Sequence, residues 1–256
     1  MFDFIYNGID FAHKIDEQSL PREDYGKHLH SFCEIIYFVR GNVEYTVESE
    51  TRHLAEGDII IIPPGKLHYA TVQSNVPYER YVLKFSESII PEYLRKKYST
   101  ETVFYSDQKK YGIIFGQFDV YHKKYSKEEL HTIFLCETVK LMVMLLREPS
   151  VSPSVIHSEF IDNIVNYIDE NLRSKITVQT LTDKFHYSKS FLNIEFKRQM
   201  KIPLMKYIRY KKIIAAHQMI INGIKKSDAA AAMGFEDYST FYRTYRKYVS
   251  EGVLIE

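Results

Sequence analysis

The sequence predicts an α+β protein of two domains, in which an antiparallel β domain is followed by an all-helical domain. Between about residues 30 and 90, short segments rich in aromatic and β-branched residues alternate with turn residues, a pattern typical of antiparallel strands. From about residue 127 onward, apolar residues recur at steps of three and four, the period of amphipathic helices. Proline and serine at 149–154 interrupt this helical pattern. We therefore expect a first domain at 1–148, a linker at 149–155 and a second domain at 156–256.

Composition restricts the class of protein. Of the 256 residues, 45% are hydrophobic and 26% are charged, a balance typical of soluble globular proteins. No apolar run is long enough to span a membrane, and the N-terminus lacks the pattern of a signal peptide, so we expect a cytoplasmic protein with no membrane partner. The two cysteines, Cys33 and Cys136, are far apart, which argues against a disulfide framework and against a cysteine zinc site.

Charge is unevenly distributed along the chain. Acidic side chains outnumber basic ones in residues 1–153, whereas basic side chains outnumber acidic ones in residues 154–256. A basic surplus suits a polyanion such as DNA, but a surplus of this size also occurs on ordinary protein surfaces. The sequence motifs must therefore decide between these two interpretations.

The clearest strand segments are 34–39, 43–47, 59–62 and 78–86. A long amphipathic helix is expected at 128–147, with an apolar stripe formed by Leu130, Ile133, Phe134, Leu141, Met144 and Leu145. This helix is expected to pack on the β domain. It can also pair with its copy in a homodimer, and the sequence leaves both roles open.

Residues 28–68 contain polar residues at spacings that suit a binding site. His28, His30, Glu34 and Gly41 form the pattern His-x-His-x3-Glu-x6-Gly, and Gly57, Pro63, Gly65 and His68 form the pattern Gly-x5-Pro-x-Gly-x2-His. Side chains two residues apart on a strand share one face, so His28, His30 and Glu34 are expected to point into one cavity together with His68. Ile36 and Phe38 continue that face and are expected to line the cavity below Glu34.

These two patterns resemble the motifs of cupin barrels, so the resemblance implies a cupin-like barrel for the first domain. Three imidazoles and one carboxylate can bind a divalent transition metal such as iron, manganese, nickel or zinc. The same side chains can instead form hydrogen bonds with the hydroxyl groups of a small organic effector, or can be satisfied structural groups. The sequence leaves these three roles open.

The second half reads as a series of helices. Segments with helical period cover 160–172, 188–200, 203–221 and 238–249, and shorter helices are expected after Thr177 and over 227–233. Thr177, Ser188 and Asp237 are suitable N-caps because each offers a side-chain oxygen to the first backbone N–H groups. Two helix-turn-helix units therefore flank one long linker helix.

The segment 234–248, GFEDYSTFYRTYRKY, resembles the signature of AraC/XylS-type transcription regulators. The resemblance implies a second recognition helix whose Phe241 and Tyr245 pack inward. Its outer face can then reach bases and phosphates in the major groove. The side chains expected to contact DNA here are Tyr238, Ser239, Tyr242, Arg243 and Arg246.

The first helix-turn-helix unit departs from the family pattern. Ile194 stands where the first recognition helix usually has an arginine, and Lys201, Lys211 and Lys226 replace other typical residues. Contacts with DNA are expected from Lys189, Ser190, Asn193 and Lys197, which share the outer face of their helix. We therefore expect sequence specificity to depend more on the second unit.

These features predict a DNA-binding transcription regulator, more in keeping with an activator, that responds to a small molecule in the barrel. Regulators of this type commonly bind sugars, so the resemblance favours a sugar effector and a homodimer on double-stranded DNA. No catalytic residue is expected, and no cofactor beyond the metal considered above. The alternatives are a metal-dependent cupin enzyme with a DNA-binding appendage, and a partner-binding protein with degenerate DNA-binding units.

Overall fold

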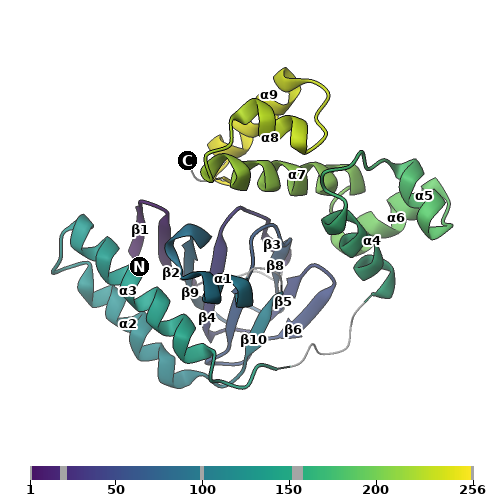
Figure 1. Cartoon of the computed structure of the whole chain (residues 1–256). Helices are drawn as coiled ribbons and strands as arrows, with labels where there is room; N and C mark the ends of the chain where they lie inside the picture. The colour runs from purple at the N-terminus through teal and green to yellow at the C-terminus, as the bar shows by residue number, and fades with distance from the viewer. Residues whose placement is uncertain (1, 18–21, 99–100, 152–157, 255–256) are drawn as a thin grey trace. The chain divides into compact units, whose positions relative to one another are not determined.

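The computed structural model describes residues 2–17, 22–98, 101–151 and 158–254. They form two compact units with the main boundary near residue 154 (Figure 1). Residues 152–155 of the expected linker lie outside the described residues. Within the described ranges, no helix is long and apolar enough to cross a membrane.

The first unit contains two antiparallel sheets. One has the strand order β1-β2-β9-β4-β7-β10 and the other has the order β3-β8-β5-β6. The strands are β1 (Phe2–Tyr6), β2 (Ile9–Asp16), β3 (Arg22–His28), β4 (Cys33–Arg40), β5 (Val43–Val47), β6 (Glu50–His53), β7 (Ile59–Ile62), β8 (His68–Val72), β9 (Tyr78–Phe85) and β10 (Val103–Tyr105). The four segments that carry the clearest strand signal are confirmed as β4, β5, β7 and β9.

The central strands are buried on both faces, and each face contributes to a different core. In β4, Ile35 and Tyr37 belong to the cluster shared with the helices, whereas Ile36 and Phe38 belong to the cluster shared with β5 and β8. This division follows from the two-residue period of a strand. The second cluster joins residues of both sheets, so the sheets face each other across a packed apolar layer.

Helices cover the other face of the six-stranded sheet (Figure 1). They are α1 (Glu92–Tyr98), α2 (Gly112–Tyr121) and α3 (Lys127–Leu145), with short 3-10 turns η1 (Glu87–Ile89) and η2 (Lys109–Tyr111). Helix α3 confirms the long helix expected at 128–147, and it begins with a capping box between Ser126 and Glu129. Met144 is 39% exposed, so it does not belong to the buried stripe that the sequence predicted.

The second unit is all helical. Its helices are α4 (Glu159–Glu170), α5 (Val178–Phe185), α6 (Lys189–Met200), α7 (Leu204–Ile221), α8 (Lys226–Ala232) and α9 (Tyr238–Ser250). The three expected N-caps are confirmed: Thr177, Ser188 and Asp237 each accept a hydrogen bond from a backbone N–H of the first turn. The expected arrangement of two helix-turn-helix units, α5–α6 and α8–α9, around the linker helix α7 is therefore confirmed.

A buried lysine joins the two helix-turn-helix units. The Lys212 ammonium group on α7 donates hydrogen bonds to the Ser174 carbonyl oxygen before α5, at 2.7 Å, and to the Met233 carbonyl oxygen after α8, at 2.8 Å. Lys212 is only 8% exposed, and burial lowers its pKa. Gly234 has a φ of +70°, a left-handed conformation that glycine adopts without strain, so glycine suits this turn.

We expect Lys212→Met to destabilise the protein by about 2–5 kcal/mol, because two buried carbonyl oxygens lose a charged donor. Urea unfolding, followed by the circular dichroism of the helices, measures this loss of stability as a lower midpoint. Lys184→Met, on the exposed surface of α5, is the matched control and should leave the midpoint nearly unchanged. Equal midpoints for the two variants would show that Lys212 does not stabilise the fold.

Candidate effector and DNA sites

The four polar residues singled out by spacing come together in the β domain. One ring nitrogen each of His28, His30 and His68 and one carboxylate oxygen of Glu34 all lie within 4.8 Å of one another. We expected His28, His30 and Glu34 on one continuous strand, and that expectation is wrong. Strand β3 ends at His28 and β4 begins at Cys33, so His30 lies in the connection between them.

Hydrogen bonds orient the cluster. The His68 Nδ1 lies 2.8 Å from the Lys66 carbonyl oxygen, which can accept its hydrogen, and the Nε2 atom faces Glu34. The distance from His68 Nε2 to Glu34 Oε2 is 3.3 Å. Tyr45 stacks beside His68, with ring centroids 6.3 Å apart, and burial and then the nearby Glu34 carboxylate raise the pKa of Tyr45.

The donor set fits a transition metal in its chemistry. Around a tetrahedral ion with bonds of about 2.1 Å, neighbouring ligand atoms are about 3.4 Å apart. The observed separations reach 4.8 Å, so a bound ion would draw the most distant of these atoms closer by about 1.4 Å. The bond from His68 to a backbone carbonyl is also the outer contact that fixes the ring of a metal-binding histidine. The geometry suits a metal and equally suits hydrogen bonds to the hydroxyl groups of a ligand.

The strand register reveals charged residues that the sequence analysis missed. Lys84 lies opposite Asp10 on one neighbouring strand and opposite Glu34 on the other, while Lys14 lies opposite Arg80. All five therefore share the face of β2, β9 and β4 that carries the cluster. The alternation of Arg80, Val82 and Lys84 along 78–86 was visible in the sequence, but their neighbours depend on the register.

Contacts hold these charges in place. Arg80 is 7% exposed, pairs with Asp16 and lies over the Tyr78 ring, with its guanidinium carbon 4.0 Å from the centroid. The Lys84 Nζ lies 3.6 Å from an Asp10 carboxylate oxygen. Burial, followed by the charges of Lys84 and Arg80, lowers the pKa of Lys14. We call the charged side chains on this face the charged wall: Asp10, Lys14, Glu34, Arg80 and Lys84. Such a polar surface, held in place by its own contacts, suits a hydrophilic ligand rather than a purely apolar one.

Ile36 and Phe38 lie in the packed apolar layer between the sheets, and both are almost completely buried. They continue the face of Glu34, as expected from the two-residue period. Because they are buried among other apolar side chains, they form the apolar layer that would lie beneath a ligand near Glu34.

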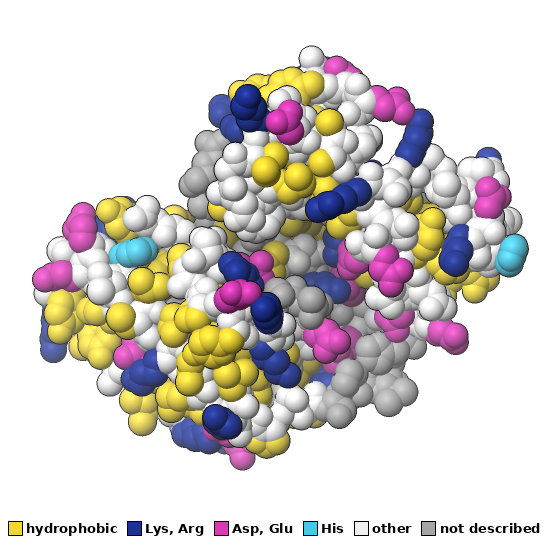
Figure 2. Space-filling model, viewed as in Figure 1, with side chains coloured by type: hydrophobic (Ala, Val, Ile, Leu, Met, Phe, Trp, Pro, Cys, Tyr) yellow, Lys and Arg dark blue, Asp and Glu magenta, His cyan; other side chains and the backbone are white. Residues whose placement is uncertain are grey.

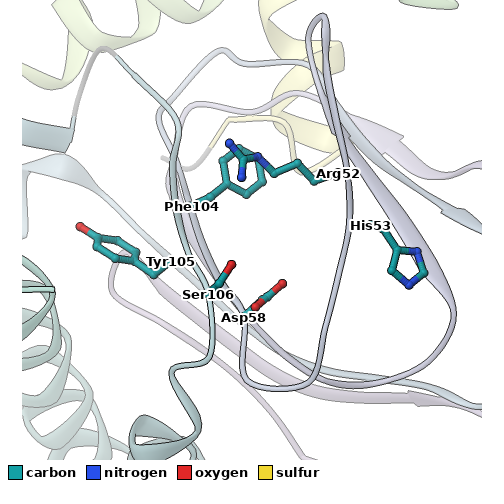
Figure 3. A pocket seen from close by; sticks show the side chains of 6 residues that line it. All are labelled: Arg52, His53, Asp58, Phe104, Tyr105 and Ser106. Atoms are coloured by element: carbon teal, nitrogen blue, oxygen red, sulfur yellow. The ribbon is translucent and has the colours of Figure 1, made fainter. Parts of the chain in front are cut away.

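A separate pocket, of about 190 Å³, lies at the edge of the β domain (Figure 3). It is lined by Arg52, His53, Asp58, Phe104, Tyr105 and Ser106. The Arg52 guanidinium stacks over the Phe104 ring at 4.3 Å. Both carboxylate oxygens of Asp58 accept backbone N–H groups, from Ala55 and from Asp107. These bonds give Asp58 a structural role, so we assign no ligand to this pocket.

The second recognition helix, α9, has the two faces that its sequence predicts. Phe241 and Tyr245 are buried, with exposures of 0% and 1%. The outer face is exposed over its whole length and carries Tyr238, Ser239, Tyr242, Arg243 and Arg246. The Asp237 carboxylate accepts two backbone N–H groups, which fixes the start of this helix.

A basic groove between α7 and α9 extends that face. It has a volume of about 450 Å³, and its lining includes Lys206 and Arg209 from α7 together with Arg243 and Lys247 from α9. Sequence analysis named only Arg243 among these four. Lys247 lies in the signature segment 234–248 but was not expected to contact DNA. Lys206 and Arg209 were missed because α7 was treated as a spacer, and only its packing against α9 brings these side chains beside Arg243.

The first recognition helix, α6, exposes the four residues expected to contact DNA: Lys189, Ser190, Asn193 and Lys197. The Asn193 side-chain amide donates to the Lys189 carbonyl oxygen at 2.9 Å, one turn earlier on the same helix. Arg198 pairs with Glu195 on the same helix and lowers the pKa of that carboxyl to about 2.

The N-caps align the two recognition helices residue by residue. Ile194 is the sixth residue after Ser188, and Arg243 is the sixth residue after Asp237. Each lies midway between two buried residues, so both occupy the centre of the outward face. The structure thus places Ile194 at the position that Arg243 occupies in the second unit.

Comparison with known proteins matches both units. Residues 15–134 match the AraC-like ligand binding domain, and residues 181–252 match a helix-turn-helix domain. The chain is 20% identical to the HTH-type transcriptional regulator YdiP of Escherichia coli, over 90% of this chain and 80% of that protein. It is 22% identical to the transcriptional activator RhaR of E. coli, over 86% and 83%. The solved structure of ToxT from Vibrio cholerae is 12% identical over 92% of each chain, with a TM-score of 0.39.

Proposed function

The chain belongs to the AraC type of DNA-binding transcription regulators, and we propose from this premise that a small-molecule effector bound in the β domain controls the protein's affinity for DNA. It is a regulator rather than an enzyme. The observation that carries the proposal is the pair of recognition helices with matched N-caps and exposed faces that carry basic side chains. Effector binding would shift the protein between arrangements with different affinity for DNA.

The effector that we propose is a hydroxylated molecule such as a sugar. His28, His30, Glu34 and His68 supply a close group of hydrogen-bonding atoms, and the charged wall adds fixed donors and acceptors. Hydroxyl groups can both donate to carboxylates and accept from lysine, arginine or imidazole N–H groups. Ile36 and Phe38 would lie beneath the bound molecule as part of the packed apolar layer.

We further propose that the protein activates transcription and acts in the cytoplasm, where its DNA target lies. The relative RhaR is described by name as a transcriptional activator, which supports this direction of regulation.

A homodimer through α2 and α3 completes the proposal. Ile113 and Val120 on α2 are 70% and 48% exposed, and Val143 on α3 is 39% exposed. Figure 2 shows hydrophobic side chains gathered over this part of the surface, at the left of the view. Large exposed apolar groups on adjacent helices favour pairing with a second copy, and two copies suit a repeated DNA site.

A divalent transition metal at the four-residue cluster is the second candidate role. The observation that favours it is the mutual distance of 4.8 Å or less among four suitable ligand atoms. A bound ion would hold the β3–β4 connection to β8 and would offer coordination positions to an effector.

Arg243→Ala should weaken binding to the selected DNA site by about 1–3 kcal/mol, because a charge-assisted contact to a base or phosphate is lost. Fluorescence anisotropy at several salt concentrations measures the effect. Arg147→Ala, an exposed arginine of the first unit, is the control and should bind normally. An unchanged affinity for the Arg243 variant would remove this residue from the DNA site.

The two roles of the cluster predict different metal contents. A metal site predicts about one transition-metal ion per chain in protein prepared without chelator, and none in His68→Ala. Hydroxyl recognition predicts metal-free protein whose effector response survives chelation but is lost in the same variant. Elemental analysis by mass spectrometry and effector titration separate the two. A normal response in metal-free His68→Ala would contradict both roles.

Replacing Ile113 and Val143 together by aspartate should convert the dimer to a monomer, because two buried apolar contacts become buried charges. Light scattering during gel filtration gives the mass directly. Val76→Asp is the control, since Val76 is 49% exposed on the β8–β9 connection. A wild-type protein that is monomeric at micromolar concentration would refute this interface.

A further inference from the structure

The outward face of the first recognition helix has an apolar centre. Ile194 is 68% exposed and Phe191, one turn earlier, is 46% exposed. Polar and basic residues surround them on the same helix, namely Lys189, Ser190, Asn193, Lys197 and Arg198. Ile194 therefore departs from its own surroundings as well as from Arg243.

The backbone geometry fixes the direction of Ile194. Leu192 and Phe196, two residues to either side, are both 0% exposed. A step of two residues in a helix is a rotation of about 200°, so Ile194 points almost directly away from the core of the domain. Ile194 thus lies at the centre of the outward face of α6.

A cluster of three aromatic rings holds Phe191 beside it. The Phe191 ring lies 5.5 Å from that of Phe160 on α4 and 5.1 Å from that of Tyr187 before α6. The Phe160 and Tyr187 rings are themselves 5.3 Å apart, so each ring contacts both of the others. These contacts limit the movement of Phe191 and keep an apolar surface next to Ile194.

We propose that Ile194, with Phe191 beside it, contacts thymine C5-methyl groups in the major groove, so that the first unit selects thymine where the second unit uses Arg243. This inference rests on the proposed function, because it assumes that α6 docks on DNA. The thymine methyl is the apolar group that base edges offer in the major groove. The exposed lysines beside Ile194, Lys189 and Lys197, suit flanking phosphates, which favours DNA over an apolar protein partner.

Thymine-to-deoxyuridine exchange tests the proposal, since it removes the C5-methyl group and nothing else from the base. Binding duplexes are first selected from a random pool with the full-length protein, and each thymine is then exchanged in turn. Wild-type protein should lose affinity about fourfold per contacted methyl group, the value of one buried methyl. Ile194→Ala should bind the thymine duplex more weakly and should show no further loss at those positions.

Matched variants separate reading of the methyl from general damage. Ile194→Val, which keeps a branched apolar end, should retain part of the loss on exchange. Ile221→Ala, at the end of α7 and 43% exposed in the wild type, should keep the full wild-type profile. Circular dichroism confirms that each variant is folded.

Two results overturn the proposal. If no exchanged thymine affects wild-type binding, or if Ile194→Ala keeps the same profile as wild type, Ile194 does not read thymine. A selected sequence is still obtained in both cases, so the DNA-binding function stands. Failure to select any sequence would instead contradict the proposed function, and this inference with it.

Discussion

The two bonds of the Lys212 ammonium group set the geometry on which DNA recognition depends. Each helix-turn-helix unit is small, and its own core is a few apolar side chains on two short helices. Lys212 lies on α7 between them and bonds to one carbonyl oxygen of each. A charged donor in a buried place is costly to desolvate, so both acceptors must stay where they are. The linker helix α7 and these two bonds together hold the two units at their separation.

Beyond that bond, the direction of each recognition helix depends on its N-cap. Ser188 and Asp237 set the first residue of α6 and α9, and the 3.6-residue period then decides which side chains face outward. Leu192 and Phe196 in one helix, and Phe241 and Tyr245 in the other, hold the opposite face in the core. The same rule therefore yields two equivalent outward positions, and only the residue type at those positions differs.

Sequence reasoning succeeded where the structure is local. Caps, helix spans and the four clearest strands depend on neighbours within a few residues, and these predictions are confirmed. The spacing of the His28–His68 patterns also selected four side chains that lie close together in the structure, although the connection after β3 replaces the continuous strand assumed for them. The charged wall could not be found this way, because Lys14 and Arg80 are 66 residues apart and only the β2–β9 register pairs them. Lys206 and Arg209 were missed for the same reason, since tertiary packing places them beside α9.

The two recognition helices differ at their central outward residue, so we expect one to contribute more to affinity for DNA and the other more to selection of the base sequence. Arg243 carries a charge and lies in a groove with three further basic side chains, so its unit supplies long-range attraction that weakens with salt. Ile194 contributes no charge, and its contact with a base depends on shape and on removing water from a methyl group. Such a contact has little reach and adds little to non-specific binding. A regulator built this way would be attracted to any DNA chiefly through its second unit and would gain additional discrimination when the first unit meets a matching sequence.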